Sequence, residues 1–266
     1  MRRLIPLVVF AFSAAAQTPS LSGVWMANLQ RSHIAGPPVS QYLVLFQPAT
    51  GRKGQKLVKS ITGMRTKYGL EKSVLTFRDD GKPMMTPYQG IPTRVTASWQ
   101  GSELAMTARV AGTPRLIEST YKLSAGGHTL TIDSTVTGGR RPEHNTIVLT
   151  KQAQSAAAPL LAPETTAGEH FKNVKTAELK NLPVSQFIDH MHYFAWSLGT
   201  NCEFCHVRGD FASDQKKHKK RARKMIHMAA TIDQVNFHGH PDVRCFTCHE
   251  GHHHPLRYPQ FAKASQ

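Results

Sequence analysis

Two copies of a five-residue pattern, Cys-x-x-Cys-His, contain all four cysteines of this 266-residue chain. Cysteines three positions apart lie on one side of a helical turn, so both thiols can bond to the two vinyl groups of one porphyrin. The histidine that follows can then bind the iron from the same side. This spacing is the attachment signature of c-type haem. The sequence therefore predicts two covalent c-type haems, held by Cys202, Cys205 and His206 and by Cys245, Cys248 and His249.

A structural zinc module is the alternative use of the same four cysteines. The 39 residues between Cys205 and Cys245 exceed the usual gap between zinc half-sites. Zinc also does not require a histidine directly after each second cysteine. Zinc is therefore the remote interpretation and haem the favoured one.

A haem iron of this kind needs a second axial ligand, and the segment before the first motif contains a candidate. Apolar residues recur between Val184 and Leu198 at helical spacing, with Met191 in the middle of the stripe. His190 and His192 point about 100° to either side of Met191 on a helix. A methionine on such a stripe can also be a space-filling core residue, so the stripe alone leaves ligation open.

The second motif is preceded by a similar segment. Ser213 and Asp214 are typical of a helix start, and a basic run from 216 to 224 leads into an amphipathic stretch with Met225 and Met228. Either methionine could face a haem. Histidines near the motif could replace methionine as iron ligands; they are His238, His240, His252, His253 and His254. A helix with methionine, a loop and a motif thus occur twice, from about 184 to 206 and from about 214 to 249.

Three blocks in the segment from about 173 to 255 resemble the cytochrome c subunit family of photosynthetic reaction centres. The blocks are residues 209–214, 222–228 and 245–251. In that family a helix lies over each haem, its methionine is the distal ligand, and the motif histidine is the proximal ligand.

The resemblance implies an iron-ligand pair for each haem. His206 pairs with Met191, and His249 pairs with Met225, with Met228 as the fallback. Family members carry four haems and a lipid-bearing cysteine, whereas this chain has two motifs, no such cysteine and a β-rich region in place of the family's amino-terminal half. Electron transfer is therefore implied, but donation to a photo-oxidised pigment is not.

The region before the motifs has the alternation of β-strands. Apolar residues alternate from Val95 to Trp99 and from Leu104 to Val110 around a turn, and a second hairpin spans 121–132. Gly23-Val24-Trp25 resembles the Gly-x-Trp element of lipocalin-like barrels, which implies an up-and-down barrel able to hold a small apolar ligand. Trp25 as a plain core residue is the competing interpretation.

The composition divides the chain into segments, and the predicted fold is α+β with two domains. Residues 1–16 read as a signal peptide, with Arg2 and Arg3 before a short apolar stretch. Residues 17–151 form an antiparallel β-barrel or sandwich, 152–168 an exposed linker, and 169–266 a mostly helical dihaem cytochrome c domain. We therefore expect an exported, periplasmic protein that is soluble after cleavage of the signal peptide.

The chain is strongly basic, with 33 Lys and Arg against 17 Asp and Glu and a net charge of +16. An exported protein rarely meets nucleic acid, so the charge favours docking on an acidic redox partner or an anionic membrane surface. The overall expectation is a dihaem electron carrier rather than an enzyme with its own substrate. The alternative is a haem-dependent oxidoreductase, peroxidase-like or acting on a ligand of the β region, which would need an open iron position.

Overall fold

The computed structural model of the chain describes residues 19–36, 38–66, 69–139 and 141–256. The predicted signal peptide, residues 1–16, lies outside the described residues.

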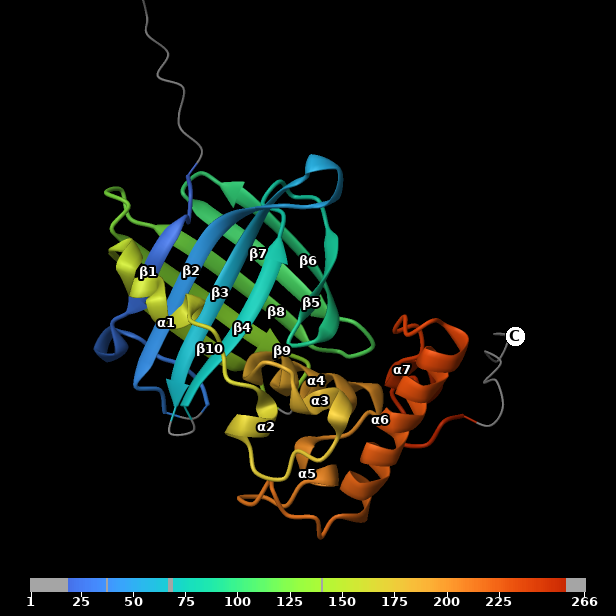
Figure 1. The fold of residues 1–266 in the computed structure, drawn as a ribbon. Coiled ribbons are helices and arrows are strands. Elements are labelled where there is room, and N and C mark those ends of the chain that lie inside the picture. The colour runs from blue at the N-terminus through green and yellow to red at the C-terminus, as the bar shows by residue number, and fades with distance from the viewer. Residues whose placement is uncertain (1–18, 37, 67–68, 140, 257–266) are drawn as a thin grey trace, which may run out of the picture.

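Ten antiparallel strands form one sheet in the described part of the chain, in the order β4-β3-β2-β1-β10-β9-β8-β7-β6-β5. The strands are β1 (Gly23–Ala27), β2 (Gln41–Thr50), β3 (Lys56–Thr66), β4 (Gly69–Phe77), β5 (Met84–Tyr88), β6 (Ile91–Gln100), β7 (Glu103–Val110), β8 (Leu116–Leu123), β9 (Thr129–Thr137) and β10 (Glu143–Gln152). Strand β1 pairs with both β2 and β10, so the first and last strands of the β region are neighbours. The two edge strands of the sheet, β4 and β5, follow one another in sequence. The sheet is therefore a nearly closed up-and-down barrel (Figure 1).

The predicted hairpins are confirmed as β6–β7 and β8–β9. Trp25 is completely buried in the barrel core, and its indole N–H donates to the Leu21 carbonyl at 2.8 Å. Its core neighbours include Phe46 and Leu149. These alternating side chains fill the inside of the barrel, as the period-two pattern predicts.

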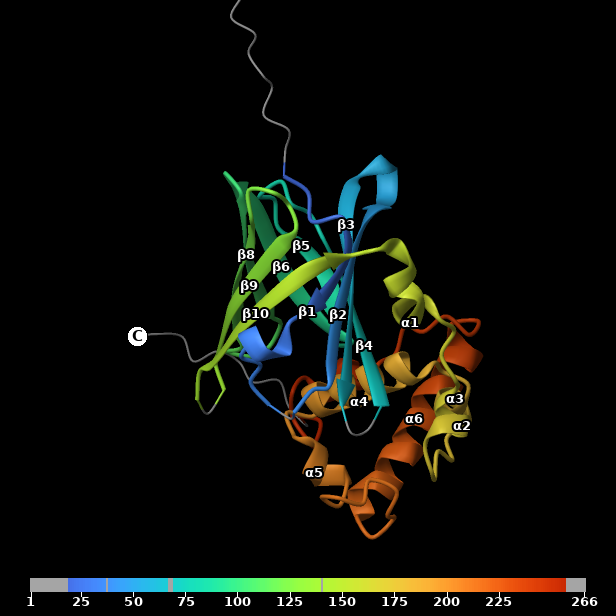
Figure 2. The same ribbon diagram turned by 90° about the vertical axis from the view of Figure 1, so that its left-hand side faces the viewer.

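Helices follow the barrel, and all but α1 gather at one end of it (Figures 1 and 2). They are α1 (Ala158–Leu161), α2 (Ala167–His170), α3 (Ala177–Lys180), α4 (Val184–Ser197), α5 (Cys202–Cys205), α6 (Lys217–Asn236) and α7 (Cys245–His249). The predicted combination of a β-barrel and a mostly helical carboxyl-terminal region is confirmed.

The segment predicted as an exposed linker, 152–168, is instead partly packed on the barrel. A short 3-10 helix (Gln154–Ala157) and α1 lie against the outer face of the sheet. Ala157 and Leu160 are buried there, and Gly63 of β3 leaves the space that the Leu160 side chain occupies. Small apolar residues are common both in exposed linkers and in segments that pack on a sheet. Composition alone therefore does not distinguish a linker from a packed segment. The domain boundaries themselves stay a prediction.

Both ends of helix α4 are connected to the barrel by polar contacts. At its start, Glu164 accepts hydrogen bonds from the Ser185 amide at 2.6 Å and the Ser185 hydroxyl at 2.9 Å, and it lies 3.7 Å from the Lys72 ammonium of β4. At its end, the Trp196 indole donates to the Ala111 carbonyl at 2.6 Å. The barrel therefore fixes the helix that carries Met191.

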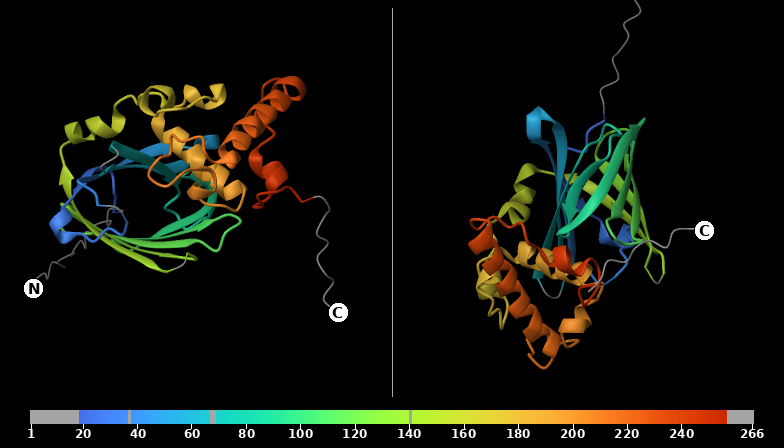
Figure 3. Two further views of the ribbon diagram at one scale, coloured as in Figure 1. Left: turned by 90° about the horizontal axis from the view of Figure 1, so that it is seen from below. Right: turned by 90° about the vertical axis from the view of Figure 1, so that its right-hand side faces the viewer.

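Helices α6 and α7 extend away from the barrel (Figure 3). Beyond Leu160, the buried hydrophobic side chains among the described residues are Ala167 and Leu179 alone. Large apolar side chains are exposed instead, including Phe211, Met225 and Met228. The described residues contain no helix that is both long enough and apolar enough to cross a membrane.

Candidate haem-attachment sites

Both Cys-x-x-Cys-His motifs form a single helical turn, as their spacing requires. Helix α5 begins at Cys202 and ends at Cys205, and both Cys245 and Cys248 lie in α7. At the start of α7, the Thr247 hydroxyl accepts a hydrogen bond from the Arg244 amide at 3.0 Å. All four thiols are free. Partial burial raises the pKa of the Cys205 and Cys245 thiols. Each motif thus presents two thiols on one turn, which is what two thioether bonds to one porphyrin require.

The two motif histidines make equivalent hydrogen bonds. His206 Nδ1 lies 2.9 Å from the Phe211 carbonyl oxygen, and His249 Nδ1 lies 2.8 Å from the His252 carbonyl oxygen. A carbonyl only accepts, so Nδ1 carries the proton in both rings and Nε2 keeps its lone pair. Metal-binding histidines are oriented in this way. Partial burial also lowers the pKa of His206, which favours the neutral, metal-binding ring. The donor set therefore fits haem iron at both motifs.

The loop after the first motif is fixed by ion pairs around Asp214. Its carboxylate lies 2.9 Å from Lys175 Nζ, 2.9 Å from an Arg223 guanidinium nitrogen and 3.6 Å from Lys219 Nζ, and it also accepts from the Asn173 amide at 3.0 Å. Hydrogen bonding, first of all from Lys175, holds the pKa of Asp214 well below its usual range. This cluster positions the loop that supplies the carbonyl for His206.

The expected helix start at Ser213 and Asp214 is wrong by three residues, since α6 begins at Lys217. The residue pattern correctly indicated a helix, but the Asp214 carboxylate binds cations instead of capping backbone amides. The pairing of this one carboxylate with three cations depends on tertiary contacts that local residue patterns do not indicate.

Met191 is half-buried on α4. His190 donates from Nδ1 to the Gln186 carbonyl at 2.8 Å on its own helix. The Nδ1 atom of His192 is buried and has no hydrogen-bond partner among the described residues. On α4, the Met191 sulfur and the buried His192 nitrogen are therefore candidate iron donors with no hydrogen bond in the described part of the chain, and the sequence pattern favoured only Met191.

Met225 and Met228 of α6 are equally exposed, at 44% each, so exposure does not separate them. Their helical neighbours do. Met228 lies four, seven and eleven positions after Lys224, Arg221 and Lys217, on the exposed basic face. Met225 shares its face with half-buried residues, namely His218, Ala222, Ala229 and Ile232. The geometry of α6 therefore favours Met225 as the ligand, with Met228 as the fallback.

The alternative histidine ligands all lie at the surface. His238, His240, His252, His253 and His254 are exposed. His240 lies 3.5 Å from the Asp242 carboxylate. Within the described ranges, no group of three or more His, Cys, Asp or Glu side chains is arranged to hold a metal ion, whereas a zinc module would need the four cysteines to meet.

Backbone and ring contacts join the two motifs. The Gly251 amide, next to α7, donates to the Ser197 carbonyl at the end of α4 at 2.9 Å. A Cβ atom on Gly199 would lie 2.0 Å from the Gly251 carbonyl oxygen. Phe204, between the first pair of cysteines, stacks on His218 with ring centroids 4.1 Å apart. The two Cys-x-x-Cys-His motifs are therefore parts of one packed unit.

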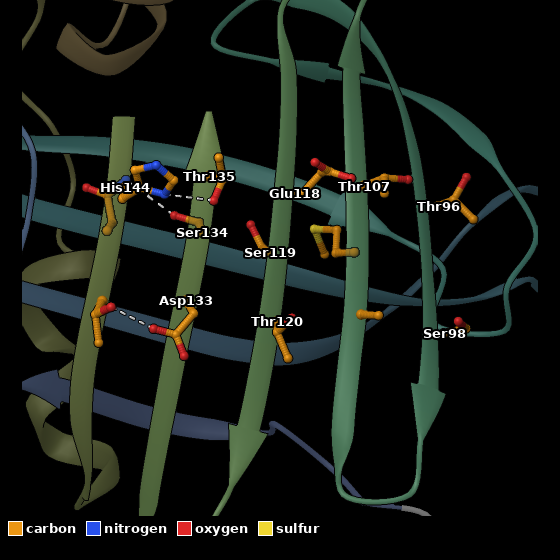
Figure 4. A pocket seen from close by; sticks show the side chains of 14 residues that line it. Thr96, Ser98, Thr107, Glu118, Ser119, Thr120, Asp133, Ser134, Thr135 and His144 are labelled. Carbon is orange, nitrogen blue, oxygen red and sulfur yellow. Dashed lines mark hydrogen bonds between the residues drawn. The ribbon is translucent and has the colours of Figure 1, made fainter. Parts of the chain in front are cut away.

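A second candidate site is a polar depression of about 530 Å³ on the outer face of strands β6–β10 (Figure 4). Its side chains bond one another: Thr146 donates to Asp133 at 2.7 Å, and His144 lies 3.0 Å from the Thr135 hydroxyl. The lining is polar and outside the barrel, so it does not match the small apolar ligand expected inside, where Trp25 and its neighbours are packed. That ligand stays a prediction.

Comparison with known proteins finds similarity in both regions. The family profile "Photosynthetic reaction centre cytochrome C subunit" matches residues 132–263. The photosynthetic reaction center cytochrome c subunit of Thermochromatium tepidum is 34% identical over 110 residues, which are 39% of this chain and 27% of that protein. This chain therefore corresponds to about a quarter of that relative's length.

Solved structures align with about half of this chain. Fatty-acid-binding protein 1 from Echinococcus granulosus has a TM-score of 0.35 and 9% identity, covering 50% of this chain and 98% of its own. Secretory abundant heat soluble protein 4 from Ramazzottius varieornatus has a TM-score of 0.34 and 14% identity, covering 50% and 94%. Because these TM-scores are low, the barrel is assigned from the strand pairings of this chain. The family match is the stronger result, and it confirms that the carboxyl-terminal region, residues 132–263, is similar to the photosynthetic reaction centre cytochrome c subunit family.

Proposed function

We propose that this chain is an exported dihaem c-type cytochrome that transfers electrons between redox partners. The observation that carries the proposal is the matched orientation of His206 and His249, each with Nδ1 on a backbone carbonyl. A histidine held in this way can bind iron only through Nε2. His190 has the same kind of contact on its own helix; His206 and His249 differ from it because each directly follows the second cysteine of a Cys-x-x-Cys-His motif.

Each residue of the two motifs has a defined role in this proposal. The cysteines hold the porphyrins by thioether bonds: Cys202 and Cys205 in the first site, Cys245 and Cys248 in the second. His206 and His249 are the proximal ligands, and Met191 and Met225 are the distal ligands. When bound, haem iron supplies one-electron chemistry by alternating between its ferric and ferrous forms, and methionine opposite histidine raises the potential. Exposed apolar side chains such as Phe211 would cover the porphyrins.

Absorption spectroscopy of the haem-loaded protein tests the ligand assignments. The wild type should show two six-coordinate, low-spin haems and a near-infrared band from methionine ligation to ferric iron. Met191→Ala and Met225→Ala should each remove about half of that band, whereas the matched control Met228→Ala should retain it. Loss of the band in Met228→Ala but not in Met225→Ala would transfer the role to Met228. Full retention in Met191→Ala would contradict the first assignment and direct attention to His192.

The same spectra separate an electron carrier from a haem enzyme. An enzyme of the peroxidase type needs an open coordination position, so one haem would be five-coordinate and high-spin. Rapid reaction of the wild type with hydrogen peroxide or cyanide would favour the enzyme. Slow reaction of both haems is the result expected for the carrier.

We further propose that the partner is acidic and docks on the outer face of α6. This face carries four exposed cations, Lys217, Lys220, Arg221 and Lys224, whereas Lys219 and Arg223 face inward and pair with Asp214. Such a surface raises the association rate of anions, and salt reduces the effect. The cations lie on the helix that also carries Met225, close to where electrons would leave or enter.

Small inorganic oxidants can test this docking surface without an identified partner. Oxidation of the reduced protein by ferricyanide, an anion, should slow several-fold in the double variant Lys220→Glu/Lys224→Glu. A cationic cobalt complex should react faster with the same variant. The matched control is Lys53→Glu/Lys56→Glu, which reverses two exposed lysines of the barrel and should change little. Equal effects of both double variants would contradict docking on the α6 face. Binding of the wild type to phosphatidylglycerol vesicles at physiological salt would favour an anionic membrane over an acidic protein as the partner.

A further inference from the structure

The hydrogen bonds of the two motif histidines differ in one respect. The Phe211 carbonyl, which His206 uses, also accepts from the Lys219 ammonium at 2.8 Å. The His252 carbonyl, which His249 uses, has no cationic side chain bonded to it in the part of the chain that the structure describes. Two otherwise equivalent proximal ligands therefore meet acceptors of different strength.

Lys219 is held firmly in this position. Its ammonium also donates to the Ala212 carbonyl at 3.0 Å and the Ser213 carbonyl at 2.9 Å, and it lies 3.6 Å from the Asp214 carboxylate. Its side chain is only 11% exposed. The neighbouring Lys220 is exposed and points about 100° away around the helix. Lys219 is therefore a fixed charge at the first site, unlike the solvated lysines beside it.

A cation on the shared carbonyl should weaken the bond that His206 donates. The strength with which a ligating histidine donates from its second nitrogen sets how basic the iron-bound nitrogen is. A strong acceptor makes the ring more electron-rich and favours ferric iron, whereas a carbonyl already bonded to an ammonium withdraws less of the Nδ1 proton. The nearby positive charge acts in the same direction, because it favours the reduced state.

We propose that Lys219 raises the reduction potential of the first haem above that of the second by competing with His206 for the Phe211 carbonyl. The proposal depends on the dihaem function proposed above. It makes Lys219 a positioning residue that acts through His206, and it gives electrons a preferred direction, from the haem at His249 toward the haem at His206.

Redox titration of the full-length, haem-loaded protein tests the proposal. The first haem is identified as the one whose potential moves in Met191→Ala. Lys219→Met should lower that potential and leave the other unchanged, while Lys219→Arg, which keeps the charge, should stay near the wild type. Lys220→Met is the matched control for a lysine charge on the same helix and should shift neither potential.

A second measurement needs no variant and so does not depend on whether Lys219→Met folds. In the reduced, diamagnetic protein, the Nδ1 proton of His206 should resonate upfield of that of His249, because its hydrogen bond is weaker. Equal resonances, an unchanged first potential in Lys219→Met, or an equal shift in Lys220→Met would each overturn the role of Lys219. A chain without covalent haem would instead overturn the proposed function, and this is seen before any titration begins.

Discussion

The rings of Trp196 and Phe246 stack with their centroids 4.3 Å apart and their planes 13° from parallel. Trp196 belongs to the helix that carries Met191, and Phe246 lies between the two cysteines of the second motif. The same indole donates to the Ala111 carbonyl of the barrel. One side chain therefore joins the barrel, helix α4 with the proposed ligand Met191, and the second Cys-x-x-Cys-His motif.

Replacement of Trp196 should separate these contacts. Trp196→Phe keeps a ring for stacking but loses the hydrogen bond to the barrel, so the free energy of unfolding should fall by about 1 kcal/mol. Trp196→Ala should lose about 1 kcal/mol more from the aromatic pair and should also alter the spectrum of the second haem. Urea denaturation and absorption spectra measure the two effects.

The matched control is Trp99→Phe. The Trp99 indole donates to the Asp79 carboxylate at 3.1 Å inside the barrel region, so a similar loss of stability is expected with no change in either haem spectrum. A spectral change in Trp99→Phe as large as that in Trp196→Ala would show that general destabilisation, and not the stack on Phe246, perturbs the haem.

A Cβ atom at Gly199 should disrupt the contact between the two motifs. Gly199 has a φ of +61°, and the added Cβ would meet the Gly251 carbonyl oxygen at 2.0 Å. Gly101, in the β6–β7 turn, has the same φ with open space around it. Gly101→Ala should therefore cost only the backbone term of about 1 kcal/mol, whereas Gly199→Ala should cost clearly more and alter the haem spectra. Equal unfolding free energies for the two variants would contradict the close approach.

Asp214 predicts a defined dependence of stability on pH. Its pKa is lowered in the folded protein, so its contribution is fully present above the unfolded value of about 4 and is lost as the pH falls toward the lower folded value. Asp214→Asn should lower the urea midpoint at pH 7, and the difference from the wild type should shrink below about pH 4. Asp242→Asn, an exposed carboxylate outside this cluster, is the control. A difference as large at pH 2 as at pH 7 would mean that Asp214 acts through packing and not through its charge.

The elements that depend on local pattern were predictable from the sequence, and those that depend on distant partners were not. Alternation from Val95 to Val110 correctly gave a hairpin, because strand faces repeat every two residues. The spacing of Met191 within its apolar stripe correctly gave helix α4. Three contacts join residues whose types alone do not identify a partner. They are the packing of Leu160 on Gly63, the stack of Trp196 on Phe246, and the hydrogen bond from Lys219 to the Phe211 carbonyl. The ligand assignments follow from resemblance and motif spacing, and they stay predictions.

The number of haems that stay bound to the unfolded chain decides whether both motifs attach haem covalently. The protein should be produced with a working c-type haem assembly system, unfolded in denaturant and weighed by mass spectrometry. The predicted mass is that of one chain with two covalent haems, falling to one haem when both cysteines of either motif are replaced, in Cys202→Ala/Cys205→Ala or Cys245→Ala/Cys248→Ala. A wild-type chain that loses all haem on unfolding, or that carries zinc in its place, would contradict covalent attachment of haem at these motifs.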